Sequence, residues 1–115
     1  SSLATGKYLV AMLSATCQDC RAAVAPLNEL GRSDQAPPVA GLMLGEEEEL
    51  AEFRKLTGPE FPIGPVNPLI FFELIGKEPP RFYYTSDGRI LGFLDELKPT
   101  PEKLLEFVSA HARKR

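Results

Sequence analysis

Two cysteines separated by two residues, Cys17 and Cys20, are the side chains of this sequence best suited to chemistry. They follow an apolar run from Tyr8 to Leu13 and open a segment with the apolar spacing of an amphipathic helix. The first sulfur would therefore lie at a helix N-terminus, where free N–H groups and the helix dipole stabilise a thiolate. The second would lie one turn further on. Such a dithiol attacks a disulfide and releases the product by closing on itself, so the sequence predicts thiol–disulfide exchange.

The composition allows a folded core that needs no cross-link. The chain has 115 residues, of which 43% are hydrophobic, and we expect a single domain over residues 1–115. A disulfide that spans only two intervening residues closes a very short loop and stabilises a fold little. Reactivity therefore explains the cysteine pair better than a structural cross-link does.

Charge and hydropathy argue against several classes of function. The net charge is −3 and the basic residues are scattered along most of the chain, unlike those of a nucleic-acid-binding surface. No run approaches the roughly 18 apolar residues of a membrane span, and residues 1–3 lack the order of a signal peptide. No Gly-rich phosphate loop is present, so we expect no cofactor other than the redox-active disulfide itself.

Strands and helices alternate along the chain around the cysteines. Apolar periodicity predicts strands at 7–13, 39–44, 81–85 and 89–93, a short strand at 61–63, and helices at 17–31, 46–56, 68–75 and from 101 onward. Thr16, Asn67 and Thr100 are the expected N-caps, and Asp87-Gly88 is the expected hairpin turn. The order predicts an α/β fold with a mixed central sheet and helices on both faces.

A CxxC motif at the end of the first strand and a proline before the hairpin give the chain a resemblance to the thioredoxin-like superfamily. Residues 8–21 resemble the strand and active-site segment, and residues 79–90 the cis-proline and hairpin, of TlpA-like and DoxX-associated thiol-disulfide oxidoreductase domains. These domains serve bacterial membrane and periplasmic redox systems. The resemblance covers nearly the whole chain and implies a β-α-β-α-β-β-α core with disulfide oxidoreductase activity.

The resemblance implies roles for individual residues. Cys17 matches the exposed nucleophilic cysteine and Cys20 the buried resolving cysteine, while either Pro79 or Pro80 matches the cis-proline beside them. In the family, the residue before the cis-proline pairs its backbone with the substrate. Physical chemistry favours Pro79 as the cis residue, with Glu78 before it, because Pro79 would have no N–H to donate if Pro80 were cis.

Two positions depart from the family pattern in ways that bear on the site. Thr16 stands where an aromatic residue commonly precedes the first cysteine, so contacts with the substrate are expected to differ there. Ala11 replaces the buried carboxylate that thioredoxin carries six residues before the first cysteine. Another base or a water molecule must then accept the proton of Cys20.

Charged residues beside the cysteines are expected to tune them. Asp19 is an anion within one turn of both sulfurs and should hold the pKa of Cys17 higher than a neutral residue would. Arg21 should offset this effect partly. We therefore expect a reducing protein, in which Cys17 attacks a substrate disulfide and Cys20 then frees the product.

Two other interpretations fit a CxxC motif. The first is a redox-inactive interaction module of thioredoxin-like fold, whose disulfide is structural. The second is the binding of a soft metal ion, but a closed zinc site needs four ligands, and the only histidine, His111, is far from Cys17 in the sequence. No metal is expected.

The chemistry and the resemblance together imply partners and a location. We expect a monomer that transfers electrons between a protein disulfide substrate and a thiol electron donor, such as a membrane redox protein. A periplasmic or other extracytoplasmic location is expected, with the cytoplasm as the alternative. The sequence does not begin with Met, which suggests a soluble domain of a membrane-anchored protein.

Overall fold

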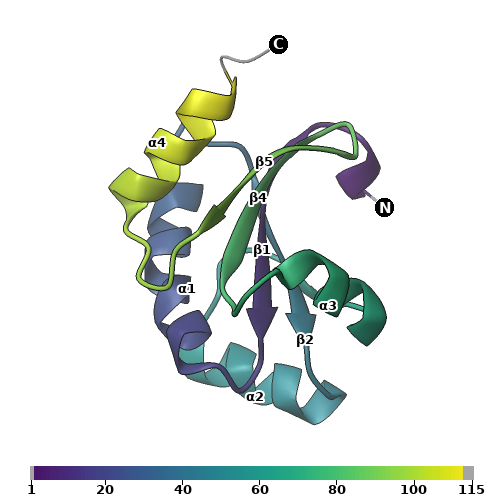
Figure 1. The fold of residues 1–115 in the computed structure, drawn as a ribbon. Coiled ribbons are helices and arrows are strands. Elements are labelled where there is room, and N and C mark those ends of the chain that lie inside the picture. Colours follow the sequence, from purple (N-terminus) through teal and green to yellow (C-terminus); the bar gives the residue numbers. More distant parts are fainter. Residues whose placement is uncertain (1, 113–115) are drawn as a thin grey trace.

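A five-stranded mixed sheet organises the protein, of which this computed structural model describes residues 2–112 (Figure 1). The strands are β1 (Lys7–Ser14), β2 (Val39–Leu44), β3 (Ile63–Pro65), β4 (Arg81–Ser86) and β5 (Arg89–Asp95), in the spatial order β3-β2-β1-β4-β5. The pairs β1–β2 and β2–β3 are parallel, whereas β1–β4 and β4–β5 are antiparallel. The predicted fold class is therefore confirmed, with β1 at the centre of the sheet.

Helices cover both faces of this sheet (Figure 1). They are α1 (Gln18–Gly31), α2 (Glu47–Thr57), α3 (Pro68–Ile75) and α4 (Pro101–Ala112), preceded by a short 3₁₀-helix, η1 (Ser2–Ala4). The helices α1, α2 and α4 contribute to the core on one face, and α3 packs on the other. Between residues 2 and 112, no helix has the length and apolar character needed to cross a membrane.

The central strand β1 is buried on both faces, as its nearly uninterrupted apolar sequence predicts. Leu9, Ala11 and Leu13 point into the core beneath α1, and Val10 and Met12 point toward α3. None of these five side chains is more than 5% exposed. Because both faces of β1 are packed, the point where the chain leaves the sheet toward the cysteines is firmly placed.

Predicted capping residues hold the starts of two helices. The Asn67 side chain accepts a hydrogen bond from the Leu69 N–H at 2.8 Å, directly before the proline that opens α3. The Thr100 hydroxyl accepts one from the Lys103 N–H at 3.1 Å at the start of α4. Strand and helix boundaries elsewhere agree with the sequence prediction to within two residues.

The short third strand lies two residues later than predicted, at Ile63–Pro65. Ile63 lies opposite Gly41 of β2, and the Gly41 N–H donates to the Pro62 carbonyl at 2.8 Å. Pro62 has no N–H of its own, so pairing begins at its carbonyl oxygen and continues along the chain beyond it. Phe61 instead places its ring in the core beneath α1.

Gly45 permits a close approach between the end of β2 and the segment that carries the cysteines. Its φ is +157°, and a Cβ at this position would lie 2.9 Å from the Ala15 Cβ and 3.1 Å from the Leu50 Cδ1. We predict that Gly45→Ala lowers the free energy of unfolding by about 1–3 kcal/mol, because the Ala15 Cβ is fixed to the backbone and cannot rotate away. Urea denaturation measures the change.

Gly64→Ala is the matched control for this prediction. Gly64 lies in β3, and a Cβ there would meet nothing within 4 Å. Alanine should therefore leave the stability unchanged or raise it by up to about 1 kcal/mol. Equal losses of stability in Gly45→Ala and Gly64→Ala would contradict the steric explanation.

Candidate active site

Backbone hydrogen bonds to β1 and β2 fix the turn between β1 and α1. The Ala15 N–H donates to the Leu44 carbonyl of β2 at 2.9 Å, and the Cys17 N–H donates to the Ser14 carbonyl at 3.1 Å. Ala15 is 2% exposed. Only a short, well-anchored turn therefore separates the buried strand from Cys17.

Cys17 is the N-cap of α1, and its sulfur takes the place of a capping oxygen. Its backbone is extended (φ −85°, ψ 123°), and its Sγ accepts a hydrogen bond from the Cys20 N–H at 3.1 Å. The predicted cap, Thr16, is one residue too early and is exposed. The sulfur can assume this role because it too accepts a hydrogen bond from the free N–H groups of the first turn. The sulfur thus lies at the positive end of the helix dipole.

Cys20 lies one turn further on, in an entirely different environment. It is 0% exposed, and its Sγ accepts a hydrogen bond from the Ser14 N–H at 3.4 Å. Burial raises the pKa of the Cys20 thiol above its usual range, and its hydrogen bond with Cys17 adds to the increase. Both cysteines are free thiols in this structure, one partly exposed and one buried. Their roles as attacking and resolving cysteine remain predictions.

A loop from the other half of the sequence reaches Cys17. The Cys17 thiol donates to the Pro79 carbonyl at 3.6 Å. The peptide bond between Pro79 and Pro80 is cis, so the preference for Pro79 as the cis residue is wrong. That preference rested on a missing N–H donor, whereas Pro79 contacts the cysteine through its carbonyl oxygen, an acceptor that proline retains. Pro80 is buried, and Glu78 is exposed.

The two charged residues beside the cysteines have different surroundings. The Asp19 carboxylate lies 3.6 Å from the Lys98 Nζ, although Lys98 is 86% exposed and its charge is well hydrated. Asp19 also makes a minor contribution to the raised pKa of Cys20. The Arg21 Nε is buried and has no hydrogen-bond partner within the described part of the chain.

Sequence reasoning missed Ser14 and Lys98 as neighbours of this site. Ser14 acts through its backbone N–H, which any residue except proline would supply at the end of β1, so its side chain gave no signal. Lys98 lies in the segment before α4, and no periodic pattern connects it with Asp19. Both contacts depend on how the chain folds back on itself.

Ala11 occupies the position where thioredoxin carries a buried acid. Ala11 is 0% exposed and belongs to the same core as Cys20. Between residues 3 and 112, no Asp or Glu residue is buried. A proton that leaves Cys20 therefore has no buried carboxylate in this region to accept it.

The described residues hold no group of three or more His, Cys, Asp or Glu side chains that could bind a metal ion. His111 lies near the end of α4, where its Nδ1 is 3.0 Å from the Phe107 carbonyl. Its ring occupies the space that a side chain on Gly92 would fill. Figure 1 shows this part of α4 running away from the end of β1, where Cys17 lies.

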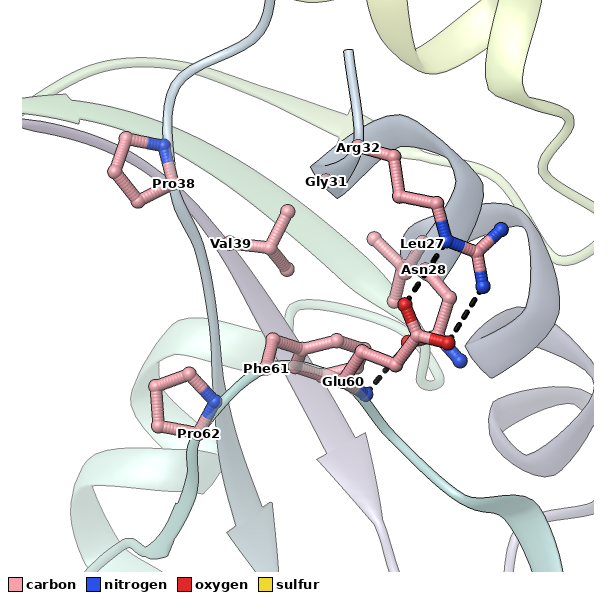
Figure 2. A pocket seen from close by; sticks show the side chains of 9 residues that line it. All are labelled: Leu27, Asn28, Gly31, Arg32, Pro38, Val39, Glu60, Phe61 and Pro62. Atoms are coloured by element: carbon pink, nitrogen blue, oxygen red, sulfur yellow. Dashed lines mark hydrogen bonds and ion pairs between the residues drawn. The ribbon is translucent and has the colours of Figure 1, made fainter.

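A pocket of about 250 Å³ lies beside the C-terminal half of α1, and neither cysteine lines it (Figure 2). Arg32 and Glu60 face each other across it in an ion pair with two hydrogen bonds. The Asn28 side chain accepts from the Glu60 N–H at 2.8 Å and donates to the Gly58 carbonyl at 3.1 Å. These polar groups satisfy one another and tie α1 to the segment that leads into β3.

Comparisons with known proteins identify the fold. No protein-family model matches the chain, and no curated protein matches it. Solved structures do match: the thioredoxin-related protein from Neisseria meningitidis serogroup B covers 96% of this chain and 87% of its own, with a TM-score of 0.76 and 16% sequence identity. The chain therefore has the thioredoxin-like fold, as predicted.

Two further solved structures support the same conclusion. A secreted Mycobacterium tuberculosis disulfide oxidoreductase homologous to E. coli DsbE matches 91% of this chain and 81% of its own, with a TM-score of 0.73 and 14% identity. StoA from Bacillus subtilis matches 89% of this chain and 81% of its own, with a TM-score of 0.71 and 17% identity. At such identities the likeness establishes the fold, and the activity has to be argued from the site.

The raised pKa of Cys20 predicts that the reduced protein becomes less stable at alkaline pH. In the unfolded chain this thiol ionises near its ordinary pKa of 9.0, whereas in the folded protein it stays protonated to higher pH. The unfolded state therefore binds fewer protons above pH 9, and stability falls by up to about 1.4 kcal/mol per pH unit. Urea denaturation with reductant between pH 8 and 11 measures this slope. Cys20→Ala should show a smaller slope, and identical slopes would contradict the assignment.

Proposed function

We propose that this protein is a thiol-disulfide oxidoreductase that exchanges disulfides with protein substrates through Cys17 and Cys20. The observation that carries the proposal is the contrast between the two sulfurs. The Cys17 sulfur is partly exposed and accepts the first-turn N–H of Cys20 at 3.1 Å, while the Cys20 thiol is fully buried behind it. An accessible thiolate with a protected second thiol is what a two-step exchange requires.

In the first step, the Cys17 thiolate attacks one sulfur of a substrate disulfide. A sulfur–sulfur bond forms between Cys17 and the substrate, and the substrate's own sulfur–sulfur bond breaks. The departing substrate sulfur leaves as a thiolate and takes up a proton from the solvent. Before the attack, the N-terminus of α1 stabilises the negative charge on Cys17.

In the second step, Cys20 loses its proton and attacks the Cys17 sulfur. The mixed disulfide breaks, the second substrate sulfur leaves as a thiolate, and a Cys17–Cys20 disulfide forms. With Ala11 in place of a buried acid, the Cys20 proton passes to the departing substrate thiolate as the new disulfide forms. The substrate gains two electrons and two protons, and a thiol electron donor must reduce the protein again.

We propose that the reaction runs in the reducing direction and outside the cytoplasm. Asp19 opposes a thiolate in the first turn of α1, which favours the disulfide form of the protein over its dithiol form. The match with a protein described as secreted supports the location. Because a single chain carries both cysteines, the reaction needs no second copy of the protein.

Trapping the mixed disulfide tests the exchange directly. Cys20→Ser should accumulate a disulfide-linked adduct with a protein disulfide such as insulin, because the residue that resolves the intermediate is gone. Cys17→Ser is the matched control and should give no adduct, because Cys20 is 0% exposed. Non-reducing electrophoresis and mass spectrometry identify the adducts. If neither variant forms one while the native fold is kept, the redox-inactive interaction module is the better interpretation.

The reduction potential tests the direction. We expect a value well below about −120 mV, which is typical of a strong dithiol oxidase, when the protein is equilibrated with glutathione mixtures. Asp19→Asn should make the potential less negative by no more than about 30 mV, because it removes the anion that opposes a thiolate. Lys98→Ala should make the potential more negative, because it removes the cation beside the Asp19 carboxylate. A potential near −120 mV for the unmodified protein would refute the reducing direction.

A further inference from the structure

Arg81 forms a strong, partly buried ion pair directly after the prolines that reach Cys17. It is the first residue of β4, and its side chain is 13% exposed. The Nε and Nη2 atoms donate to the two carboxylate oxygens of Asp95, at 2.7 and 2.8 Å. Asp95 lies opposite Arg81 in the register of β4 and β5. The hydrogen bonds from Arg81 lower the pKa of Asp95, so the carboxylate stays ionised and the two-bond geometry is maintained.

The same guanidinium also contacts the end of α3 and an aromatic ring. Its Nη1 lies 3.4 Å from the Leu74 carbonyl and 3.3 Å from the Tyr83 hydroxyl, which itself donates to that carbonyl. Leu74 is in the last turn of α3, where carbonyl groups lack partners within the helix. The guanidinium carbon lies 4.0 Å from the centre of the Phe93 ring. Arg81 therefore joins α3, β4 and β5 at one point.

Both ends of the 76–80 loop are connected to Arg81, one through its side chain and the other through its backbone. Gly76 begins the loop, and a Cβ on it would clash with the Arg81 Nη2, so the guanidinium packs directly against the Gly76 backbone. The other end of the loop is joined covalently to Arg81. Within the loop, Pro79 and Pro80 have no N–H with which to fix their own position. The Arg81 side chain therefore holds the base of a loop whose two prolines cannot donate backbone hydrogen bonds.

We propose that Arg81 is a positioning residue for the exchange reaction, holding the 76–80 loop so that the Pro79 carbonyl stays beside the Cys17 sulfur. That carbonyl lies 3.6 Å from the sulfur, so a protein whose disulfide reaches Cys17 has to pass beside it. The inference rests on the proposed function, because the position of the loop matters to catalysis only if Cys17 reacts. A purely structural role would stabilise the fold without distinguishing one substrate from another.

Comparing the rates with two substrates distinguishes a positioning role of Arg81 from a purely structural one. On this proposal, a protein disulfide such as insulin needs a correctly placed loop as well as access to Cys17, whereas the small aromatic disulfide DTNB needs only access to Cys17. For Arg81→Ala we expect kcat/KM with insulin to fall roughly ten- to hundredfold, mainly through KM, and the rate with DTNB to change less than about twofold. Arg81→Lys keeps the charge without the planar fork, so it should restore part of the insulin rate. It also serves as the test variant if Arg81→Ala does not fold.

Arg32→Ala is the matched control, because Arg32 makes a similar two-bond ion pair with Glu60 beside the pocket of Figure 2, which neither cysteine lines. It should leave both rates unchanged. The positioning role is overturned if Arg81→Ala slows insulin and DTNB equally, or if Arg32→Ala has the same selective effect on insulin. Circular dichroism and urea midpoints show that each variant is folded.

An activity-independent measurement keeps this inference distinct from the proposed function. The Lys77 N–H at the start of the loop donates to the Ile75 carbonyl at 2.8 Å. In Arg81→Ala its amide hydrogen exchange should be at least about tenfold faster, whereas Arg32→Ala should leave it unchanged. If the unmodified protein reduces neither substrate, the proposed function fails. Unchanged exchange at Lys77 in Arg81→Ala overturns the role of Arg81 itself.

Discussion

The hydrogen bond from the Cys20 N–H to the Cys17 sulfur connects the fold of this protein to its chemistry. It exists because β1 is buried on both faces and ends abruptly, so that the chain must turn at once into α1. The first turn of a helix has N–H groups without partners, and here a sulfur accepts one of them. Without the packed strand, neither the helix end nor the sulfur would have a fixed position.

The two sulfurs lie three residues apart in the sequence but have different surroundings, one the protein core and the other partly the solvent. Cys20 points into the core and faces the end of β1, where burial keeps it protonated. Cys17 stays partly exposed, between the start of α1 and the Pro79 carbonyl. The candidate site is thus assembled from two segments that the sequence separates by some sixty residues and the central sheet brings together.

Local sequence patterns predicted the strands, helices and turns well because each of these elements depends mainly on residues that are near one another in the sequence. The buried strand β1, the caps Asn67 and Thr100 and the Asp-Gly turn all leave a mark within a few residues of where they act. The errors concern the N-cap of α1 and the cis-proline, which depend on contacts with residues elsewhere in the fold. The N-cap of α1 is Cys17, one residue after the predicted Thr16, since a sulfur can cap a helix. The cis residue is Pro80 rather than Pro79.

No sequence pattern indicated the ion pairs of Arg81 and Lys98, because a single ion pair has no periodicity.

The burial of sulfur has a consequence for oxidative damage. The chain contains two cysteines and two methionines, and Cys20, Met12 and Met43 are all 0% exposed. A dissolved peroxide therefore meets the Cys17 sulfur first. The sulfenic acid formed there would lie beside the Cys20 thiol, which condenses with it to a disulfide and expels water before further oxidation to the irreversible acids. The arrangement that hides Cys20 thereby protects Cys17 as well.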